Sequence, residues 1–426
     1  GRAQAVRSPA SPLRTAFPRK YLFGKPLQGN PIPISMGLEA LLAFCSAPAA
    51  DAGQGPLRRN KSVSEFDVFD NDDAETECPS GRFTSSGSTS SGAIALTKSD
   101  VRSLMGEVAS TVQPWQSGNF TLVRQLQEAP GNFGHVDMMQ QQQQQDAGGR
   151  AVAVKRMPNH WVTSSPAEFE ERNPKVAERP WCDLAILRQL NKSNFPYVCT
   201  LHGVYRDPTH TYVVTSLASE GDLFSWCKEE PAPGPEREQL MQPLVTQIVE
   251  AVRWLHELGI AHRDLSLENI LLTGKGDDQK VQLIDFGMAT VKRSARGEVR
   301  GKLAYRAPEM HLEASYDTFL ADAFSLGVVF FGMAARDYPW TSTKKGNCRF
   351  FEYVGKFGFR TFVSKRKLRG GNGQYLSEVF SPSFVDMLEG LLQFTPDKRL
   401  TLGEEGLEDR RSVWSTRWIT DGCKGC

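Results

Sequence analysis

The sequence predicts an α+β protein with a bilobal fold, in which a small β-rich lobe is followed by a larger α-helical lobe. Strand-like runs dominate from about residue 119 to residue 218, and helical periodicity takes over after that point. Residues 1–115 are instead rich in Pro, Ser, Ala and Gly and show little sustained periodicity. Such sequence is typical of chain that cannot bury a core, so we expect a disordered N-terminal extension there.

Four strands are expected in the small lobe. Residues 120–127 (FTLVRQLQ) and 150–157 (RAVAVKRM) are strand-like and flank a Gly-containing turn and six consecutive glutamines, 140–145. The glutamine run is most simply a solvated insertion in the hairpin loop. Residues 197–207 and 210–218 are predicted as two further strands.

Helices are predicted where apolar residues recur at helical spacing. One helix covers 180–190, with Pro180 near its first turn, and a longer one covers 237–259 and ends at Gly259, a plausible cap. We therefore divide the chain into the extension at 1–115, a domain at 116–415 with lobes at about 116–217 and 218–415, and a C-terminal tail at 416–426.

The composition argues against several classes of partner. The 50 basic and 49 acidic residues give a formal net charge of +1, which provides no electrostatic footprint for nucleic acid or an anionic membrane. No uninterrupted apolar run approaches the roughly 18 residues that a membrane span needs.

Cysteine usage favours a reducing compartment. The eight cysteines are scattered, which suits a cytoplasmic or nuclear protein better than a disulfide framework. Residues 36–52 weakly resemble a signal peptide, so secretion stays open as the less favoured alternative to a short helix or disordered stretch. Cys423 and Cys426 have metal or redox spacing, but no second pair of ligands is nearby.

A charged loop lies between apolar runs at residues 259–272, GIAHRDLSLENILL. Its flanks, Ile260–Ala261 and Ile270–Leu272, are predicted as short buried strands. A charged loop held between core segments usually has a functional reason.

Five stretches together resemble the signature of the eukaryotic protein kinases, over roughly residues 119–415. In chain order they are APGNFGHV (129–136), AVAVKRM (151–157), the loop at 259–272, LIDFGMA (283–289) and YRAPEM (305–310). The resemblance implies the bilobal kinase fold and an enzyme that uses ATP and Mg²⁺, or Mn²⁺, to phosphorylate proteins, with serine and threonine as the expected acceptors.

The resemblance also implies the roles of individual residues. Lys155 contacts the α- and β-phosphates, and Asp264 orients the substrate hydroxyl and accepts its proton. Asn269 and Asp285 bind the metal, and both are counted among the catalytic residues. The nucleotide is expected to contact Ala129, Gly131 and Gly134 of the Gly-rich loop, the adenine-facing Thr215, Ser216 and Leu217, and Val136, Ala153, Asp183 and Leu271.

Two assignments are structural. Glu309 is expected to form a buried ion pair with Arg399. The charged loop at 259–272 corresponds by resemblance to the kinase catalytic loop, and Asp322 is expected to anchor it from the central helix of the large lobe.

The sequence departs from the kinase pattern at four positions, the first of which is Ala129 in place of the first glycine of the Gly-rich loop. Asp183 aligns with the Glu that usually holds the lysine, and Glu178 is the alternative partner. Ser266 replaces the Lys found two residues after the catalytic Asp in Ser/Thr kinases. Lys302 replaces a Thr of the activation segment, which covers residues 285–309. We hypothesise that Lys302 supplies the positive charge missing at position 266.

Two further positions bear on regulation and substrate choice. Glu298 aligns with an activating phosphothreonine and predicts activity without phosphorylation through a contact with Arg263, although an ordinary exposed loop carboxylate is the alternative. Asp222 and Glu268 favour basic residues near the target hydroxyl, whereas Gly332 lacks the third acid of such enzymes.

Three functions are therefore considered. An active Ser/Thr protein kinase is favoured because Lys155, Asp264, Asn269 and Asp285 are intact. The alternative from another class is a pseudokinase that acts as a nucleotide-binding scaffold or allosteric partner. A small-molecule kinase is disfavoured because the APEM stretch and the central-helix match are features of protein kinases.

Overall fold

The structure is a computed structural model that describes residues 95–129, 134–143, 146–229, 231–370, 373–404 and 406–422. All of these residues belong to one compact unit. The extension up to residue 94, the signal-peptide-like stretch 36–52, Gly131 and the Cys423/Cys426 pair lie outside the described residues.

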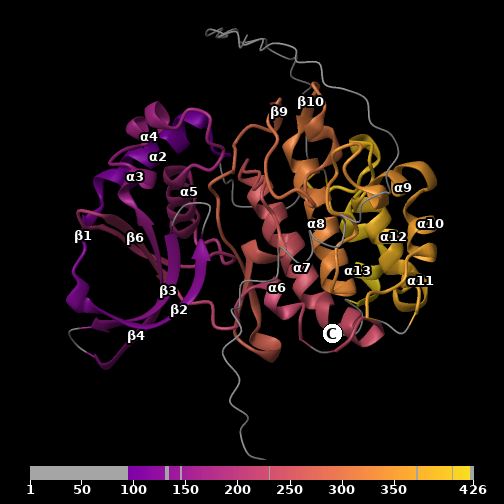
Figure 1. Ribbon diagram of the computed structural model, residues 1–426, viewed down its shortest axis with the longest axis horizontal. Coiled ribbons are helices and arrows are strands. Elements are labelled where there is room, and N and C mark those ends of the chain that lie inside the picture. The colour runs from indigo at the N-terminus through magenta and orange to yellow at the C-terminus, as the bar shows by residue number, and fades with distance from the viewer. Residues whose placement is uncertain are drawn as a thin grey trace, which may run out of the picture. The chain divides into compact units, whose positions relative to one another are not determined.

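A twisted six-stranded sheet forms the small lobe, in the spatial order β1-β5-β6-β4-β3-β2 (Figure 1). Every neighbouring pair is antiparallel except β1 with β5. The strands are β1 (Gln113–Pro114), β2 (Phe120–Ala129), β3 (Gly134–Gln143), β4 (Asp146–Pro158), β5 (Leu201–Arg206) and β6 (His210–Ser216). The predicted strands are therefore present, with shorter bounds for the last two.

The first four glutamines of the run lie in a strand and not in the predicted hairpin loop. Gln140–Gln143 are the end of β3, where Gln140 pairs with Thr121 on one side and Ala151 on the other. Because β3 lies between two strands, backbone hydrogen bonds on both edges stabilise an extended chain whatever the side chain. Gln144 and Gln145 lie outside the described residues.

Four helices accompany the sheet: α2 (Lys98–Ser110), α3 (Asn159–Val162), α4 (Pro166–Arg172) and α5 (Pro180–Lys192). The predicted helix at 180–190 is α5, which begins at Pro180 as expected. In contrast, α2 lies inside the stretch that was predicted to be disordered. Thr97 and Asp100 form a capping box at its start, and Val101, Leu104, Met105 and Val108 are buried, so local capping and packing against the lobe stabilise it.

The large lobe is mainly helical (Figure 1). Its helices are α6 (Leu223–Trp226), α7 (Pro235–Glu257), α8 (Thr318–Ala335), α9 (Arg349–Phe357), α10 (Phe359–Lys365), α11 (Leu376–Val379), α12 (Pro382–Leu391) and α13 (Arg417–Gly422). Two small antiparallel sheets pair β7 (Ile270–Thr273) with β8 (Lys280–Leu283) and β9 (Ser294–Arg296) with β10 (Ser315–Asp317). The bilobal α+β prediction is confirmed.

The core of the large lobe is built around α8. Among the described helices α8 alone is long and apolar enough to cross a membrane, but it is 94% buried inside the lobe, as a core helix is. The predicted boundary at residue 415 is wrong, because Trp418 and Ile419 of α13 are also buried in this core. The chain at 416–422 thus completes the domain and is no separate tail.

The flanks of the catalytic loop follow the prediction in part. Ile270–Leu272 lie in β7, but Ala261 makes only an isolated bridge to Thr290 and no strand forms at 260–261. Ile260, Ala261, Ile270 and Leu272 are nevertheless buried, so the loop between them is fixed at its two ends.

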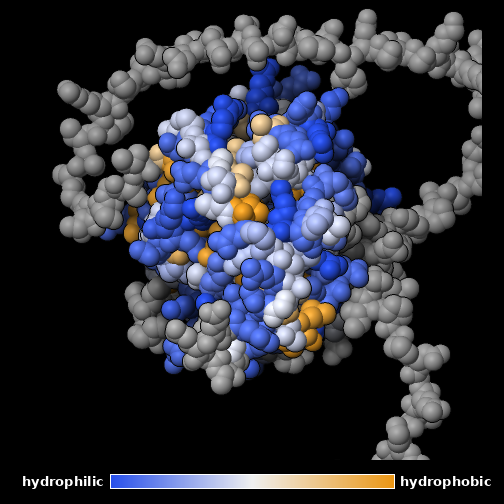
Figure 2. All heavy atoms as spheres, turned by 90° about the vertical axis from the view of Figure 1, so that its left-hand side faces the viewer, coloured by the Kyte–Doolittle hydropathy of each residue, from blue (hydrophilic) through white to orange (hydrophobic). Residues whose placement is uncertain are grey.

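Figure 2 views the molecule from the small-lobe side and shows a mostly hydrophilic face with scattered apolar atoms. On β2, Leu122 and Val123 are exposed large apolar residues. Apolar side chains scattered in this way are normal for a protein surface.

Candidate active site

A cavity of about 420 Å³ lies between the sheet and the large lobe. This volume is in the range of small-molecule pockets. Its lining contains the predicted residues Val136, Ala153, Lys155, Asp183, Thr215, Ser216, Leu217, Asn269, Leu271 and Asp285. The structure therefore brings together residues that are up to 149 positions apart, from Val136 to Asp285.

Gly134 of the Gly-rich loop is not among the residues that line this cavity. Ala129 and Gly134 pair with each other at the closed end of the β2–β3 hairpin, and Gly131 lies outside the described residues. Asp264 is also absent from the lining, but it contacts Asn269, which is part of it.

Lys155 lies on β4 and forms an ion pair with α5. Its Nζ is 3.5 Å from Oδ2 of Asp183, whose other oxygen accepts the backbone N–H of Phe286 at 2.8 Å. Burial by itself lowers the pKa of Lys155, but the charges of Asp183, Asp285 and Glu178 outweigh burial and raise the pKa. Asp183 thus lies where the sequence comparison placed the lysine's partner, and Glu178 adds a weaker charge.

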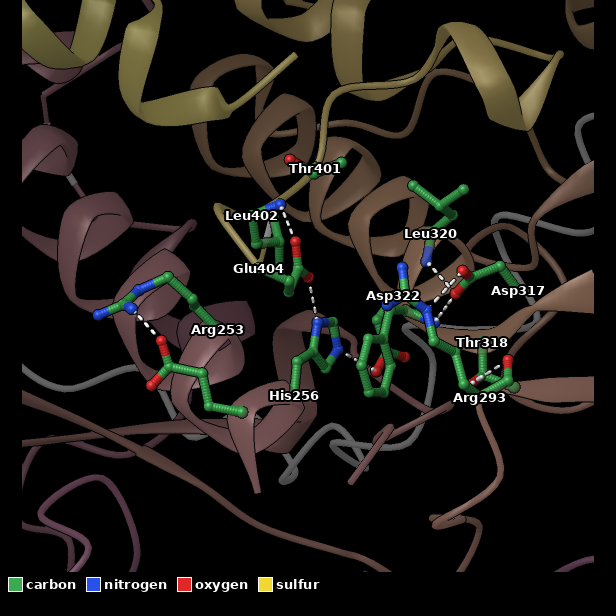
Figure 3. A network of polar contacts seen from close by, with 12 residues as sticks. Arg253, His256, Arg293, Asp317, Thr318, Leu320, Asp322, Thr401, Leu402 and Glu404 are labelled. Atoms are coloured by element: carbon green, nitrogen blue, oxygen red, sulfur yellow. Dashed lines mark hydrogen bonds and ion pairs between the residues drawn. The ribbon is translucent and has the colours of Figure 1, made fainter. Parts of the chain in front are cut away.

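Asp322 of α8 binds the backbone of the catalytic loop. Its two carboxylate oxygens accept the backbone N–H groups of His262 at 2.7 Å and Arg263 at 2.8 Å. Arg263 has a φ of 67°, a conformation that costs energy for a non-glycine residue and that this anchor stabilises. The predicted anchoring role of Asp322 is confirmed by these bonds, and Figure 3 shows Asp322 among its neighbours.

Asp264 has one carboxylate oxygen bound and one free. Asn269 Nδ2 donates to Asp264 Oδ2 at 3.0 Å and to the Asp264 carbonyl at 2.7 Å. Within the described part of the chain, Oδ1 is buried and has no hydrogen-bond partner. Burial raises the pKa of Asp264, and the charge of Lys302 partly offsets that effect. A carboxylate with an unused acceptor and a raised pKa is suited to accept a proton.

The donors near Asp264 fit a divalent cation. Asn269 turns its amide nitrogen to Asp264, which leaves its amide oxygen for a metal, and the Asp285 carboxylate lines the same cavity. Mg²⁺ prefers such oxygen ligands and usually takes only one or two from the protein, completing its shell with phosphates and water. Over the described ranges, accordingly, no group of three or more His, Cys, Asp or Glu forms a closed metal site.

Glu298 of the activation segment lies against the catalytic loop. Its Oε2 accepts from Arg263 Nη1 at 2.9 Å and is 3.7 Å from Arg300 Nη2, while Tyr316 donates to its carbonyl at 2.6 Å. Burial favours the neutral acid, but the bond to Arg263 and the positive charges lower the pKa of Glu298. The predicted contact with Arg263 is therefore present.

Lys302 also lies against the catalytic loop. Its Nζ donates to Ser266 Oγ at 2.6 Å and to Glu268 Oε2 at 3.1 Å. Glu268 is thus already paired with a cation. Gly332, the other position considered for substrate choice, is buried inside α8, where an added Cβ would be 3.0 Å from Leu267 Cδ1.

The other structural assignment, the ion pair between Glu309 and Arg399, is also confirmed. Arg399 donates to Glu309 through two bonds of 2.6 and 2.9 Å, and its side chain is fully buried. This bidentate pair joins the end of the activation segment to the C-terminal part of the lobe.

Sequence reasoning missed some residues of the site. Leu126 of β2 and Leu283 of β8 line the cavity. The only sequence signal for them was that each is an apolar residue near or at the edge of a kinase-like stretch. Gly301 has a φ of 83°, and an added Cβ would meet the Arg263 carbonyl oxygen at 2.8 Å. A glycine is needed there because the activation segment passes so close to the catalytic loop.

Comparison with known proteins supports the resemblance to protein kinases. The family described as "Protein kinase domain" matches residues 130–410, well over half of the chain. Among curated proteins, the chain is 30% identical over 211 residues to "Mitosis inducer protein kinase cdr1" of Schizosaccharomyces pombe, which covers 49% of this chain and 32% of that protein.

Two other relatives show similar levels of identity. The chain is 34% identical over 202 residues to "CBL-interacting protein kinase 4" of Oryza sativa subsp. japonica, with 46% of this chain and 40% of that protein covered. It is 32% identical over 213 residues to "Testis-specific serine/threonine-protein kinase 5" of Mus musculus, with 48% and 51% covered. The chain therefore spans between about a third and a half of the length of these relatives.

Proposed function

The chain belongs to the eukaryotic protein kinase family, and from this premise we propose that it is an active enzyme that transfers the γ-phosphoryl group of ATP to serine and threonine hydroxyls of proteins. One observation carries the proposal. The unpartnered Asp264 Oδ1 lies beside Asn269, which shares one cavity with Asp285 and the Lys155–Asp183 ion pair. A base, two metal ligands and a phosphate-binding cation are the parts that phosphoryl transfer requires.

The chain's own residues would divide the work as follows. Lys155 binds the α- and β-phosphates, and Asp183 orients it from α5. Asn269 and Asp285 hold Mg²⁺, or Mn²⁺, and Asp264 Oδ1 accepts the proton of the substrate hydroxyl. When bound, ATP supplies the phosphoryl group, whose bond to the bridging oxygen of ADP breaks as the substrate oxygen bonds to phosphorus.

The adenine end of the cavity is formed by residues of β6 and the segment after it. Thr215, Ser216 and Leu217 lie there opposite Ala153 and Leu271. Backbone groups of Ser216 and Leu217 would bind adenine, while the small side chain of Thr215 leaves the rear of the cavity accessible. The apolar side chains of Ala153, Leu217 and Leu271, next to backbone groups that can hydrogen-bond, are suited to bind a nucleotide base.

The choice of serine and threonine rests on the relatives, one of which is named a serine/threonine-protein kinase. A preference for basic residues near the target hydroxyl would now rest mainly on Asp222, because Glu268 is paired with Lys302. We also propose a cytoplasmic or nuclear location, which the free, buried Cys182, Cys199, Cys227 and Cys348 support.

One observation favours a second candidate function, a nucleotide-binding pseudokinase scaffold. Ser266 is neutral and fully buried, so the catalytic loop lacks the positive charge expected two residues after Asp264. A protein of this kind would bind nucleotide in the same cavity without turning it over.

Replacing Asp264 by Asn tests the proposal. The variant keeps the size of the side chain but lacks the basic oxygen, so phosphorylation of a generic protein substrate with labelled ATP should fall at least about 100-fold. Nucleotide binding, measured by titration calorimetry, should persist, and mass spectrometry of the product should place phosphate on serine or threonine. Equal activity of the wild type and Asp264→Asn would disprove the proposed enzyme activity. Nucleotide binding by the wild type without any turnover would support the pseudokinase scaffold instead.

A further inference from the structure

The activation segment places a lysine on the catalytic loop. Lys302 Nζ is 2.6 Å from Ser266 Oγ and 3.1 Å from Glu268 Oε2. Ser266 is two residues after Asp264, and Glu268 lines the nucleotide cavity. The ammonium group therefore contacts the catalytic loop two residues after Asp264 and pairs with a carboxylate that lines the cavity, although its own chain position is 38 residues after Asp264.

The charge of Lys302 acts on the reaction centre. Burial, the larger effect, raises the pKa of Asp264, and Lys302 is the strongest of the charged groups that lower it. The Lys302 side chain is 42% exposed, so it is accessible from solvent, and two acceptors contact its ammonium group. Negative charge spreads over the phosphoryl oxygens during transfer, and a fixed cation beside the proton acceptor stabilises it.

The neighbouring backbone fixes this arrangement. Gly301 passes over the catalytic loop so closely that no other residue fits, and its carbonyl accepts from Arg306 Nε at 2.7 Å. The Lys302 carbonyl in turn accepts from the Tyr305 N–H at 2.9 Å. Ser266 is fully buried and offers its hydroxyl as an acceptor.

We propose that Lys302 is a catalytic residue that binds the transferring phosphoryl group, and that Ser266 and Glu268 are positioning residues that hold it. This inference rests on the proposed kinase function. The cation is carried by the activation segment, four residues after Glu298, which Arg263 binds. When the activation segment becomes ordered, it therefore also brings the Lys302 ammonium group to the catalytic loop.

Exchanging the side chains of Lys302 and Ser266 tests their paired arrangement directly. Lys302→Thr should lower kcat about 100-fold by removing the charge. Ser266→Lys should also be impaired, because two ammonium groups would then be in contact. The double variant Ser266→Lys/Lys302→Thr places one cation and one hydroxyl back at the same contact and should recover most of the activity. Lys345→Thr removes an exposed lysine of the same lobe and should behave as the wild type.

Binding provides a second readout that needs no turnover. In the presence of Mg²⁺, Lys302→Thr should weaken ATP binding about tenfold but leave ADP binding unchanged, since only ATP carries the phosphate that Lys302 would contact. The Ser266→Lys/Lys302→Thr variant should restore the preference for ATP. Thermal unfolding of each variant separates these effects from loss of the fold.

The outcomes distinguish this inference from the proposed function. If the wild type is active and Lys302→Thr matches it in kcat and ATP affinity, the role of Lys302 is disproved while the kinase stands. If both folded single variants are impaired and the exchange recovers nothing, the paired arrangement is disproved. A wild type without activity, equal to Asp264→Asn, would overturn the proposed function itself.

Discussion

Glu298 shows how a single carboxylate can order the activation segment. It is bound by Arg263, which is itself held on the catalytic loop by Asp322, so the contact connects the segment to the reaction centre. Burial opposes ionisation of Glu298, but Arg263 and Arg300 keep its pKa low, so the group is charged at neutral pH. A permanent charge there would make phosphorylation of the segment unnecessary.

We expect Glu298→Ala to lower kcat about tenfold in protein that carries no phosphate on the activation segment, because a charge-assisted hydrogen bond contributes about 1.5–3 kcal/mol. The assay is the same labelled-ATP measurement, with mass spectrometry to establish that the segment is unmodified. Glu313→Ala, which removes an exposed carboxylate of the same lobe, is the matched control. Equal rates for both variants and the wild type would mean that Glu298 is an ordinary surface carboxylate.

Residues within one short motif were the easiest to predict. Asp264 and Asn269 are five positions apart in one loop, so local spacing alone brings them into contact, and Asp285 lies two residues after the end of β8. The contact between Lys302 and Ser266 spans 36 positions and could only be hypothesised, because it depends on the path of the activation segment. The segment's path follows in turn from a positive φ at Gly301, which no periodicity reveals.

The element that the sequence missed, α2, joins the two lobes. Leu96 donates its N–H to the carbonyl of Leu258 at the end of α7, while the buried face of α2 packs in the same core as α5. Lys192 of α5 is 3.2 Å from Glu107 of α2. Because α5 carries Asp183, whose side chain is one methylene shorter than Glu, the helix has to be held close to Lys155.

We expect Leu104→Asp to loosen α5 by placing a charge on the buried face of α2, where Leu104 is 8% exposed. The ion pair between Lys155 and Asp183 would lengthen, so the KM for ATP should rise about tenfold. A surface helix can shift outward at a low cost in free energy. The measurement is steady-state kinetics with ATP varied.

A matched substitution on the same helix separates docking from charge. Ser103→Asp places a carboxylate on the exposed face of α2 and should leave KM unchanged. In the Leu104→Asp background, Asp183→Glu should recover part of the ATP affinity, because the longer side chain reaches Lys155 from a displaced helix. An unchanged KM for the Leu104→Asp variant would show that α2 has no part in positioning α5.

The elements were predictable only as far as their patterns were sustained. The strands were predicted because each has a strand-like pattern of apolar residues, and α5 because it has apolar residues at helical spacing and a proline in its first turn. In contrast, α2 is bordered by Ser- and Gly-rich sequence, and its burial depends on α5 and on Leu258, which are distant in sequence. Likewise, Gln140–Gln143 form a strand because of their neighbours and not their composition.

At the scale of the whole molecule, a buried histidine joins three parts of the large lobe. His256 of α7 contacts Asp322 of α8 at 3.1 Å through Nε2 and binds Glu404 of the C-terminal segment through Nδ1 (Figure 3). Its ring also stacks on Phe319, with centroids 4.1 Å apart. Since Asp322 holds the catalytic loop, the charge of His256 bears on both stability and the site.

This network predicts that the protein loses stability in mild alkali. Burial lowers the pKa of His256, but the bonds and charges of Asp322 and Glu404 outweigh it and raise the pKa to about 9. The folded state then binds the proton more tightly than an unfolded histidine of pKa about 6.5, so the stabilisation is complete below about pH 6.5 and is lost as pH rises through about 9. The loss is at most about 3 kcal/mol in the free energy of unfolding. Urea unfolding at a series of pH values measures it against His256→Gln, which cannot carry the charge. Buried thiols titrate in both proteins, so the difference between the two curves isolates His256, and a difference that does not change with pH would contradict the prediction.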